Sequence, residues 1–158
     1  MVGGDEALAD KLMAIYNVFE FPLPKDAYLA AVGDTMFNCG TLAAAQTMGQ
    51  QGRVYYFQQA PIAYDLTLGA MHSIELLYVF GTFGSMGVIP SLGDLQVEKT
   101  VQKAWSSFAR TGKPDFPIAW PPYDASAPSV ASIDTTPSLV VNYRGGRCDK
   151  LRALGLVP

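Results

Sequence analysis

Apolar residues near the start of the chain recur at helical spacing. Leu8, Leu12 and Ile15 fall on one face of a helix that the pattern predicts from Asp5 to about Val18. The prolines of Phe21–Pro24 end this helix, because proline lacks an N–H donor and moves the residue before it away from helical geometry. A further turn or two is predicted from Lys25 to Ala31.

A second amphipathic stretch follows Gly33. Asp34 is predicted to cap the start of this helix, which ends between Gly49 and Gly52. The residues predicted to face inward are Phe37, Leu42 and Ala45.

The clearest helical pattern runs from Leu95 to Arg110. Gly93–Asp94 is predicted to open this helix, and Thr111–Gly112 closes it as a left-handed C-cap. Its predicted inward residues are Leu95, Val101, Trp105 and Phe108. A short last helix is predicted from Asp149 to Leu154.

Two runs of β-forming residues predict strands, Arg53–Gln59 and Ser138–Tyr143. Between these strands, Gly81–Pro90 is predicted to be a plain connection, and Lys113–Pro137, rich in proline and serine, to be irregular surface chain. No internal repeat and no second domain is visible, so residues 1–158 are interpreted as one segment.

Composition narrows the classes of function. Charged residues make up 16% of the chain, against roughly 25% in a typical soluble domain, and the net charge is −3. Without a Lys/Arg stripe the chain lacks the electrostatic footprint of a nucleic-acid binder. Its two uncharged windows, Thr35–Gly52 and Leu76–Gly93, are too polar or too rich in glycine to predict a transmembrane segment. The first residues have no signal-peptide pattern.

Few residues can carry chemistry. A serine nucleophile of the Gly-x-Ser-x-Gly type is absent, and the nearest imitation, Phe83–Gly87, has phenylalanine in place of the first glycine. His72 is the one histidine, so a zinc site is poorly supplied with ligands, and no metal and no cofactor is expected. Without further information, a single histidine beside an apolar run, such as His72, is more often a hydrogen-bonded structural residue than a catalyst. Glu75 lies in the apolar run Ile74–Phe80 and is predicted to be structural if it is buried.

The cysteines, Cys39 and Cys148, are compatible with two states. They suit free buried thiols in a cytosolic protein, or a disulfide that closes a large loop.

Several blocks together resemble the C-terminal portion of type-B carboxylesterases, the α/β-hydrolases that include the cholinesterases. The blocks, which extend over nearly the whole chain, are Leu12–Tyr16, Gly33-Asp34-x-x-Phe37-x-Cys39, Val54–Phe57, Gly69–Gly81, Ala104–Pro114 and Trp120–Pro121. The most specific of them are His72-x-x-Glu75-x-x-x-x-Phe80-Gly81 and Trp105-x-x-Phe108-Ala109-x-x-Gly112-x-Pro114.

The resemblance implies an α/β fold: the C-terminal part of an α/β-hydrolase, with an incomplete sheet and flanking helices. It implies that His72 is the general acid/base of a catalytic triad, with Glu75 as structural support. The family usually has glycine after this histidine, whereas this chain has Ser73. The cholinesterases join positions that match Cys39 and Cys148, so a disulfide is expected, and a bridge would favour a secreted parent.

The family's nucleophile, oxyanion-hole glycines and triad acid have no counterpart among these residues. The first hypothesis is therefore a partial carboxylesterase, inactive alone, whose partners are the missing N-terminal esterase portion and, in the complete enzyme, a carboxylic ester. A non-catalytic, cholinesterase-like binding or adhesion protein is the alternative, and an independent small α/β domain is a third. Under the first hypothesis, the strand Arg53–Gln59 is predicted to expose an unpaired edge, because its neighbouring strands in the large sheet come from the missing portion.

Overall fold

The computed structural model describes residues 6–65 and 69–158, which fall into two compact units. The helical unit comprises residues 6–47 and 142–158, and the sheet unit comprises residues 48–65 and 69–141. Asp5, the predicted start of the first helix, lies outside the described residues. The interpretation of residues 1–158 as one segment stays a prediction.

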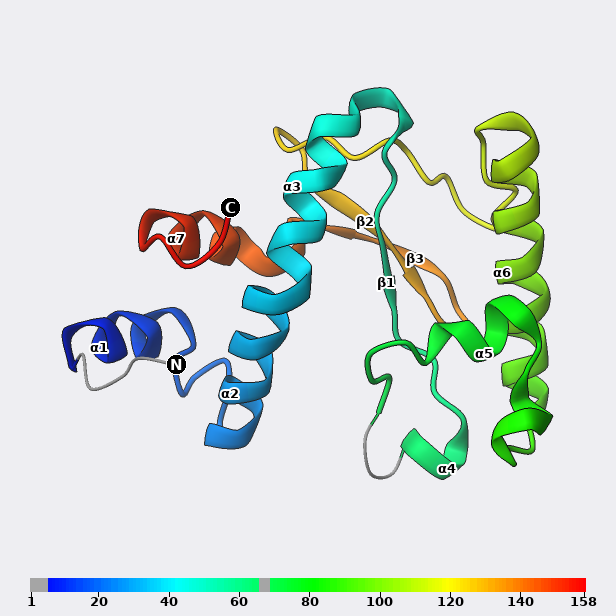
Figure 1. Ribbon diagram of the computed structural model, residues 1–158, viewed down its shortest axis with the longest axis horizontal. Helices are drawn as coiled ribbons and strands as arrows, with labels where there is room; N and C mark the ends of the chain where they lie inside the picture. Colours follow the sequence, from blue (N-terminus) through cyan, green and yellow to red (C-terminus); the bar gives the residue numbers. More distant parts are fainter. Residues whose placement is uncertain (1–5, 66–68) are drawn as a thin grey trace. The chain divides into compact units, whose positions relative to one another are not determined.

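Helices build the helical unit (Figure 1). They are α1 (Glu6–Ile15), α2 (Pro24–Gly33), the π-helical turn η1 (Asp34–Asn38), α3 (Cys39–Met48), the 3₁₀ turn η4 (Tyr143–Gly146) and α7 (Arg147–Ala153). The predicted break at Phe21–Pro24 is confirmed, because α1 ends before it and α2 begins at Pro24. The last helix is confirmed with its start moved to Arg147.

The prediction that Asp34 caps a new helix is wrong. Helices α2, η1 and α3 follow one another without a gap, and the Asp34 N–H donates to the carbonyls of Ala30 and Ala31 as in a helix interior. A cap side chain accepts from the backbone N–H groups of the first turn of its helix, whereas the Asp34 carboxylate binds side chains, including those of Tyr16 and Arg144 far away in the sequence. Leu42 and Ala45 are buried as predicted, but Phe37 is 41% exposed.

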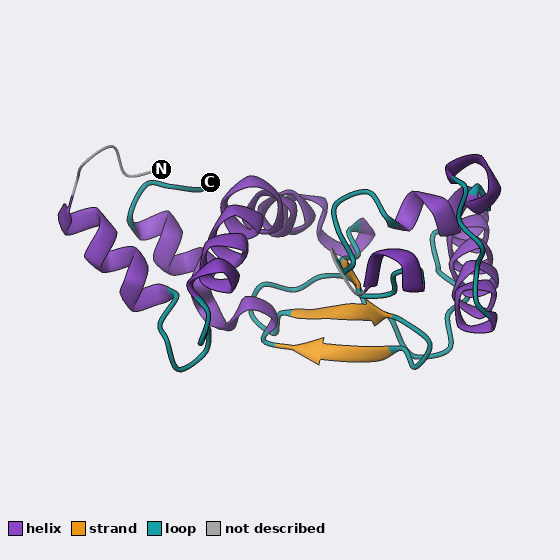
Figure 2. Ribbon diagram, turned by 90° about the horizontal axis from the view of Figure 1, so that it is seen from below, coloured by secondary structure: helices purple, strands orange, loops and turns teal. Residues whose placement is uncertain are grey.

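A sheet of three strands organises the sheet unit, in the order β1 (Tyr55–Phe57), β2 (Ser129–Ile133) and β3 (Ser138–Val141). Strand β1 is parallel to β2, with Tyr55 opposite Ala131, and β2 is antiparallel to β3, with Val130 opposite Val140. Figure 2 shows β2 and β3 as arrows of opposite direction. Both predicted strands are present in shortened form. Among the described strands, β1 pairs with β2 alone and so lies at the edge of the sheet, as predicted for Arg53–Gln59.

Strand β2 contradicts the prediction that Lys113–Pro137 is irregular. It is the central strand, and Val130–Ile133 are all buried. A strand buried on both faces does not alternate apolar and polar residues, so its small serine and alanine side chains give no period-2 pattern.

The remaining elements of the sheet unit are α4 (Ile62–Asp65), α5 (Glu75–Phe80), the 3₁₀ turns η2 (Gly49–Gln51) and η3 (Phe83–Met86), and α6 (Leu92–Thr111). Helices α5 and α6 lie side by side (Figure 1). The segment after α5 is more ordered than the predicted plain connection, because Gly81 and Gly87 adopt left-handed conformations that end α5 and η3. Gly112 ends α6 in the same way, as predicted.

Helix α6 begins earlier than predicted, with Ser91 as its N-cap. The Ser91 hydroxyl accepts from the Asp94 N–H while the Asp94 carboxylate accepts from the Ser91 N–H, which is a reciprocal capping box. Its buried residues are Asp94, Val97, Val101 and Ala104, whereas Leu95 and Phe108 are 38% and 39% exposed. The core of the sheet unit consists of Phe57, Ile74, Leu77, Tyr78, Phe83, Val88, Val97, Val101 and Ile133.

Candidate functional site

His72 lies in the turn that leads into α5, within the sheet unit. Its side chain is exposed, while Ile74, two residues on, is 3% exposed and belongs to the core. Between them Ser73 has φ 68°, a left-handed conformation that residues with a Cβ rarely adopt. The backbone thus turns sharply after His72, with its imidazole toward solvent and Ile74 in the core.

Glu75 is the first residue of α5 and is half-buried. Burial raises the pKa of the Tyr55 phenol, and the Glu75 carboxylate raises it further, so the two side chains are electrostatic neighbours. The apolar run that contains Glu75 forms α5, in which Leu77 and Tyr78 are buried. His72 therefore lies three residues before α5 and Glu75 begins the helix, and the roles of both residues stay predictions.

Cys39 and Cys148 form a disulfide within the helical unit, between α3 and α7. Their Cα atoms are 5.3 Å apart and their sequence separation is 109. The predicted bridge is confirmed. The bridge lies in the helical unit, whereas His72 and Glu75 lie in the sheet unit.

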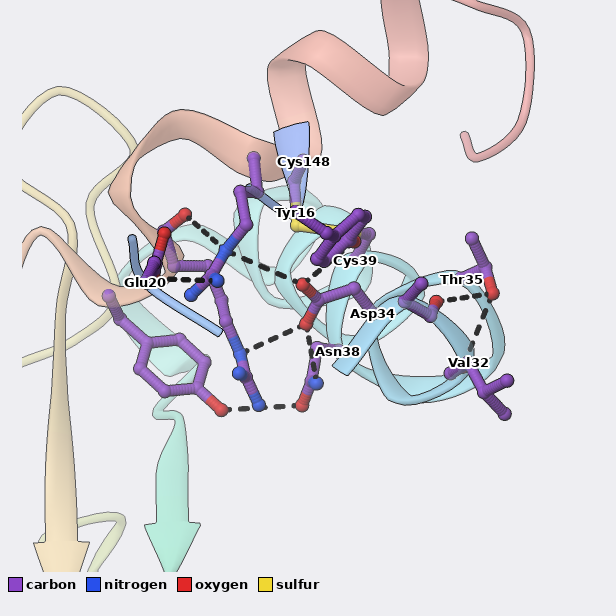
Figure 3. Close-up of polar contacts among 12 residues, drawn as sticks. Tyr16, Glu20, Val32, Asp34, Thr35, Asn38, Cys39 and Cys148 are labelled. Atoms are coloured by element: carbon purple, nitrogen blue, oxygen red, sulfur yellow. Dashed lines mark hydrogen bonds and ion pairs between the residues drawn. A yellow bond between two sulfur atoms is a disulfide. The ribbon is translucent and has the colours of Figure 1, made fainter. Parts of the chain in front are cut away.

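Asp34 is the centre of a buried polar cluster that sequence reasoning missed (Figure 3). Its carboxylate accepts hydrogen bonds from the Tyr16 hydroxyl at 3.0 Å and from the Asn38 amide at 2.8 Å. It also forms ion pairs with the Nε atoms of Arg144 at 3.0 Å and Arg147 at 3.6 Å. The Asp34 side chain has no exposed surface, so these contacts replace its hydration.

The arginines of this cluster have further partners. Arg147 pairs with Glu20 at 2.8 Å and lies over the rings of Tyr16 and Phe21, at 5.9 Å and 5.3 Å from their centroids. Burial raises the pKa of the Tyr16 phenol, and the Asp34 carboxylate and its hydrogen bond raise it further, so Tyr16 stays a hydrogen-bond donor at neutral pH. The cluster joins the residue that follows α1 to η1, η4 and α7, so it connects the elements of the helical unit.

Asp94 forms a second buried network, in the sheet unit. Tyr78 donates to its Oδ1 at 2.7 Å and Gln59 donates to the same atom at 2.9 Å, while Ser91 donates to Oδ2. Burial alone would raise the pKa of the Asp94 carboxyl, but the hydrogen bonds from Tyr78, Ser91 and Gln59 outweigh it and lower the pKa. A carboxylate whose acceptor sites are filled in this way holds α5 and α6 together and is unsuited to proton transfer.

Of the residues predicted to carry chemistry, His72 is the chain's one histidine, and it is exposed. Within residues 6–65 and 69–158, no group of three or more His, Cys, Asp or Glu side chains could hold a metal ion. Of the helices that the structure describes, none combines the length and the apolar character needed to span a bilayer.

Comparisons with known proteins agree with the fold. A family model described as the carboxylesterase family matches residues 15–151. Acetylcholinesterase of Gallus gallus is 27% identical over 114 residues, which are 67% of this chain and 15% of that protein. Liver carboxylesterase of Sus scrofa is 33% identical over 110 residues, which are 63% of this chain and 19% of that protein. The chain thus spans less than a fifth of these two curated relatives.

A solved structure described as a thermophilic PNB esterase superposes with a TM-score of 0.71 at 23% identity. The superposition covers 92% of this chain and 30% of the esterase. At this identity the likeness shows the fold alone. The chain has a partial α/β-hydrolase fold, as predicted, with three strands and their flanking helices.

Proposed function

This chain belongs to the carboxylesterase family, and from that premise we propose that it supplies the general acid/base histidine, His72, of a carboxylic ester hydrolase. One observation carries the proposal: the chain's single histidine lies exposed on the turn before α5, inside the matched residues 15–151. This position lets the imidazole meet groups from outside the chain.

In this role the imidazole has two tasks. It takes the proton of a serine hydroxyl as that oxygen attacks the ester carbonyl, and it returns the proton to the leaving alcohol. The left-handed turn at Ser73 sets the direction of the His72 side chain relative to α5. Glu75, in the first turn of α5, supports this loop through its electrostatic contact with Tyr55.

The nucleophile, the oxyanion hole and the triad acid belong, in this proposal, to esterase sequence that is not among these residues. The sequence has no serine two positions after any glycine, so no nucleophile elbow of the Gly-x-Ser-x-Gly type is present. A histidine without its nucleophile and oxyanion hole retains little catalytic power. We therefore expect the ester substrate to bind only when the chain and the remaining esterase portion are together.

A chimera tests the proposal. The part of the thermophilic PNB esterase that superposes on this chain is replaced by the chain, and turnover of p-nitrophenyl acetate is measured. We expect an active chimera in which His72→Ala lowers kcat by about 10³-fold or more. Asp149→Asn, on the exposed surface of α7, is the matched control and should leave turnover unchanged.

Two outcomes contradict the proposal. If His72→Ala and Asp149→Asn chimeras hydrolyse the ester equally well, His72 is not the acid/base. A folded chimera without activity would instead support the non-catalytic, cholinesterase-like binding function.

A further inference from the structure

An aromatic cavity of about 170 Å³ lies within the sheet unit, separate from the turn that carries His72. It opens between β1, α6 and the segment after α6. The side chains that shape it are Arg53, Tyr55, Trp105, Phe108, Pro114 and Trp120. A cavity of roughly this size, about 150 Å³, holds a benzene molecule in an engineered protein core. The space therefore fits one six-membered ring with a small substituent.

The walls of this aromatic cavity are held in place. The ring centroid of Trp105 lies 5.1 Å from that of Tyr55, in an edge-to-face arrangement, and 5.8 Å from that of Trp120. The Trp120 indole N–H donates to the Val54 carbonyl at 3.0 Å, and the Arg53 Nε–H donates to the Trp120 carbonyl at 3.2 Å. These two crossed hydrogen bonds fix Trp120 against the start of β1, so the cavity is preformed and a ligand need not order it.

Arg53 is the one charged residue in the lining. Its guanidinium carbon lies 5.5 Å from the ring centroid of Phe108, and its Nε–H donates to the Trp120 carbonyl. In the described part of the chain, no carboxylate forms an ion pair with Arg53. Guanidinium groups bind carboxylates through paired N–H donors, and the terminal nitrogens of Arg53 remain suited to that contact.

From this combination we infer that the aromatic cavity binds a small aromatic carboxylate. The ring of the ligand packs among Tyr55, Trp105 and Trp120, and its carboxylate pairs with Arg53. The positive charge of Arg53 favours such an anion over an aromatic cation, which Arg53 repels. The inference rests on the sheet unit alone and does not depend on a role for His72.

Tryptophan fluorescence tests this inference directly, because both tryptophans of the chain line the cavity. Benzoate, benzyl alcohol and benzylamine, which carry negative, neutral and positive groups on the same ring, are titrated into the full chain at low protein concentration. We expect a saturable change in emission with benzoate, a weaker one with benzyl alcohol and none with benzylamine. Equal responses to benzoate and benzylamine would overturn the inference without the need for any variant.

Two variants then locate the charge that binds the ligand. A charge-assisted hydrogen bond contributes about 1.5–3 kcal/mol, so Arg53→Gln should raise the Kd of benzoate at least about tenfold. The Kd of benzyl alcohol should rise less, because that ligand loses only the packing of the Arg53 side chain and its hydrogen bond to Trp120. Arg110→Gln removes the same charge from the last turn of α6 and is the matched control. If the two variants bind benzoate equally well, Arg53 does not hold the carboxylate and the inference fails. Circular dichroism of both variants checks their fold.

Discussion

Replacing Asp34 by asparagine tests whether the buried cluster holds the helical unit together. The change keeps the size of the side chain but removes the charge that faces Arg144 and Arg147. The side chains of these arginines are only 19% and 13% exposed, so water cannot fully replace the lost carboxylate. Removing one partner of a buried ion pair costs about 3–5 kcal/mol, because the other charge stays buried and uncompensated.

The loss is large against the whole stability of a domain, which is about 5–15 kcal/mol. Asp149→Asn is the matched control, because it breaks the pair of Asp149 with Arg152, whose side chains are 80% and 45% exposed. Exposed pairs contribute up to about 1 kcal/mol. Urea unfolding followed by circular dichroism at the helical band gives the unfolding midpoint of both variants. Helices α5 and α6 of the sheet unit contribute to the same band, so the two variants are compared by their shift from the unchanged chain. The reasoning is refuted if Asp34→Asn shifts the midpoint no more than Asp149→Asn does.

Four further predictions concern pH, the disulfide, catalysis and association. Burial and the neighbouring carboxylates raise the pKa of Tyr16 and Tyr78 above the pKa of about 10 that tyrosine has in the unfolded chain. Their contribution to stability is therefore complete below about pH 10 and is lost as the pH rises above it, so the urea midpoint should fall over that range. Replacing both Cys39 and Cys148 by serine should lower the free energy of unfolding by about 2–5 kcal/mol, and an unchanged urea midpoint would contradict this. The isolated chain should hydrolyse p-nitrophenyl acetate no faster than free imidazole does, and a saturable rate abolished by His72→Ala would reveal a hidden nucleophile. Size-exclusion chromatography should show concentration-dependent association through the edge of β1, whereas a cooperatively melting monomer at high concentration would contradict it.

The sequence predicts those helix and strand boundaries that depend on residues next to one another in the chain, such as caps and breaks. Gly112 ends α6 because a left-handed residue is needed there, and this was visible from the glycine after an amphipathic run. Asp34 was misinterpreted because aspartate after glycine resembles a cap, while its real partners, Arg144 and Arg147, lie more than 100 positions away. Strand β2 was missed because burial between β1 and β3 comes from tertiary structure and leaves no alternation in Ser129–Ile133.

The candidate site also contains features that the sequence predicts and features that only the fold shows. Nothing in the spacing around His72 distinguishes a catalyst from a structural histidine, and only the resemblance to a family pointed to it. The disulfide likewise came from the resemblance and is confirmed by the Cα distance of 5.3 Å. The aromatic cavity is not predictable from the sequence, because the helical pattern places Trp105 and Phe108 in the core, whereas the fold leaves Trp105 half-buried and Phe108 39% exposed.

The bridge between Cys39 and Cys148 makes the chain a covalent ring with two tails. Every residue of the sheet unit lies inside this ring, between the two half-cystines. A protease that cuts once within the sheet unit therefore releases no fragment, and the nicked protein keeps its full mass until a reductant opens the ring. The turn that carries His72 can thus be cleaved while both of its flanking pieces remain tethered to the same helical unit.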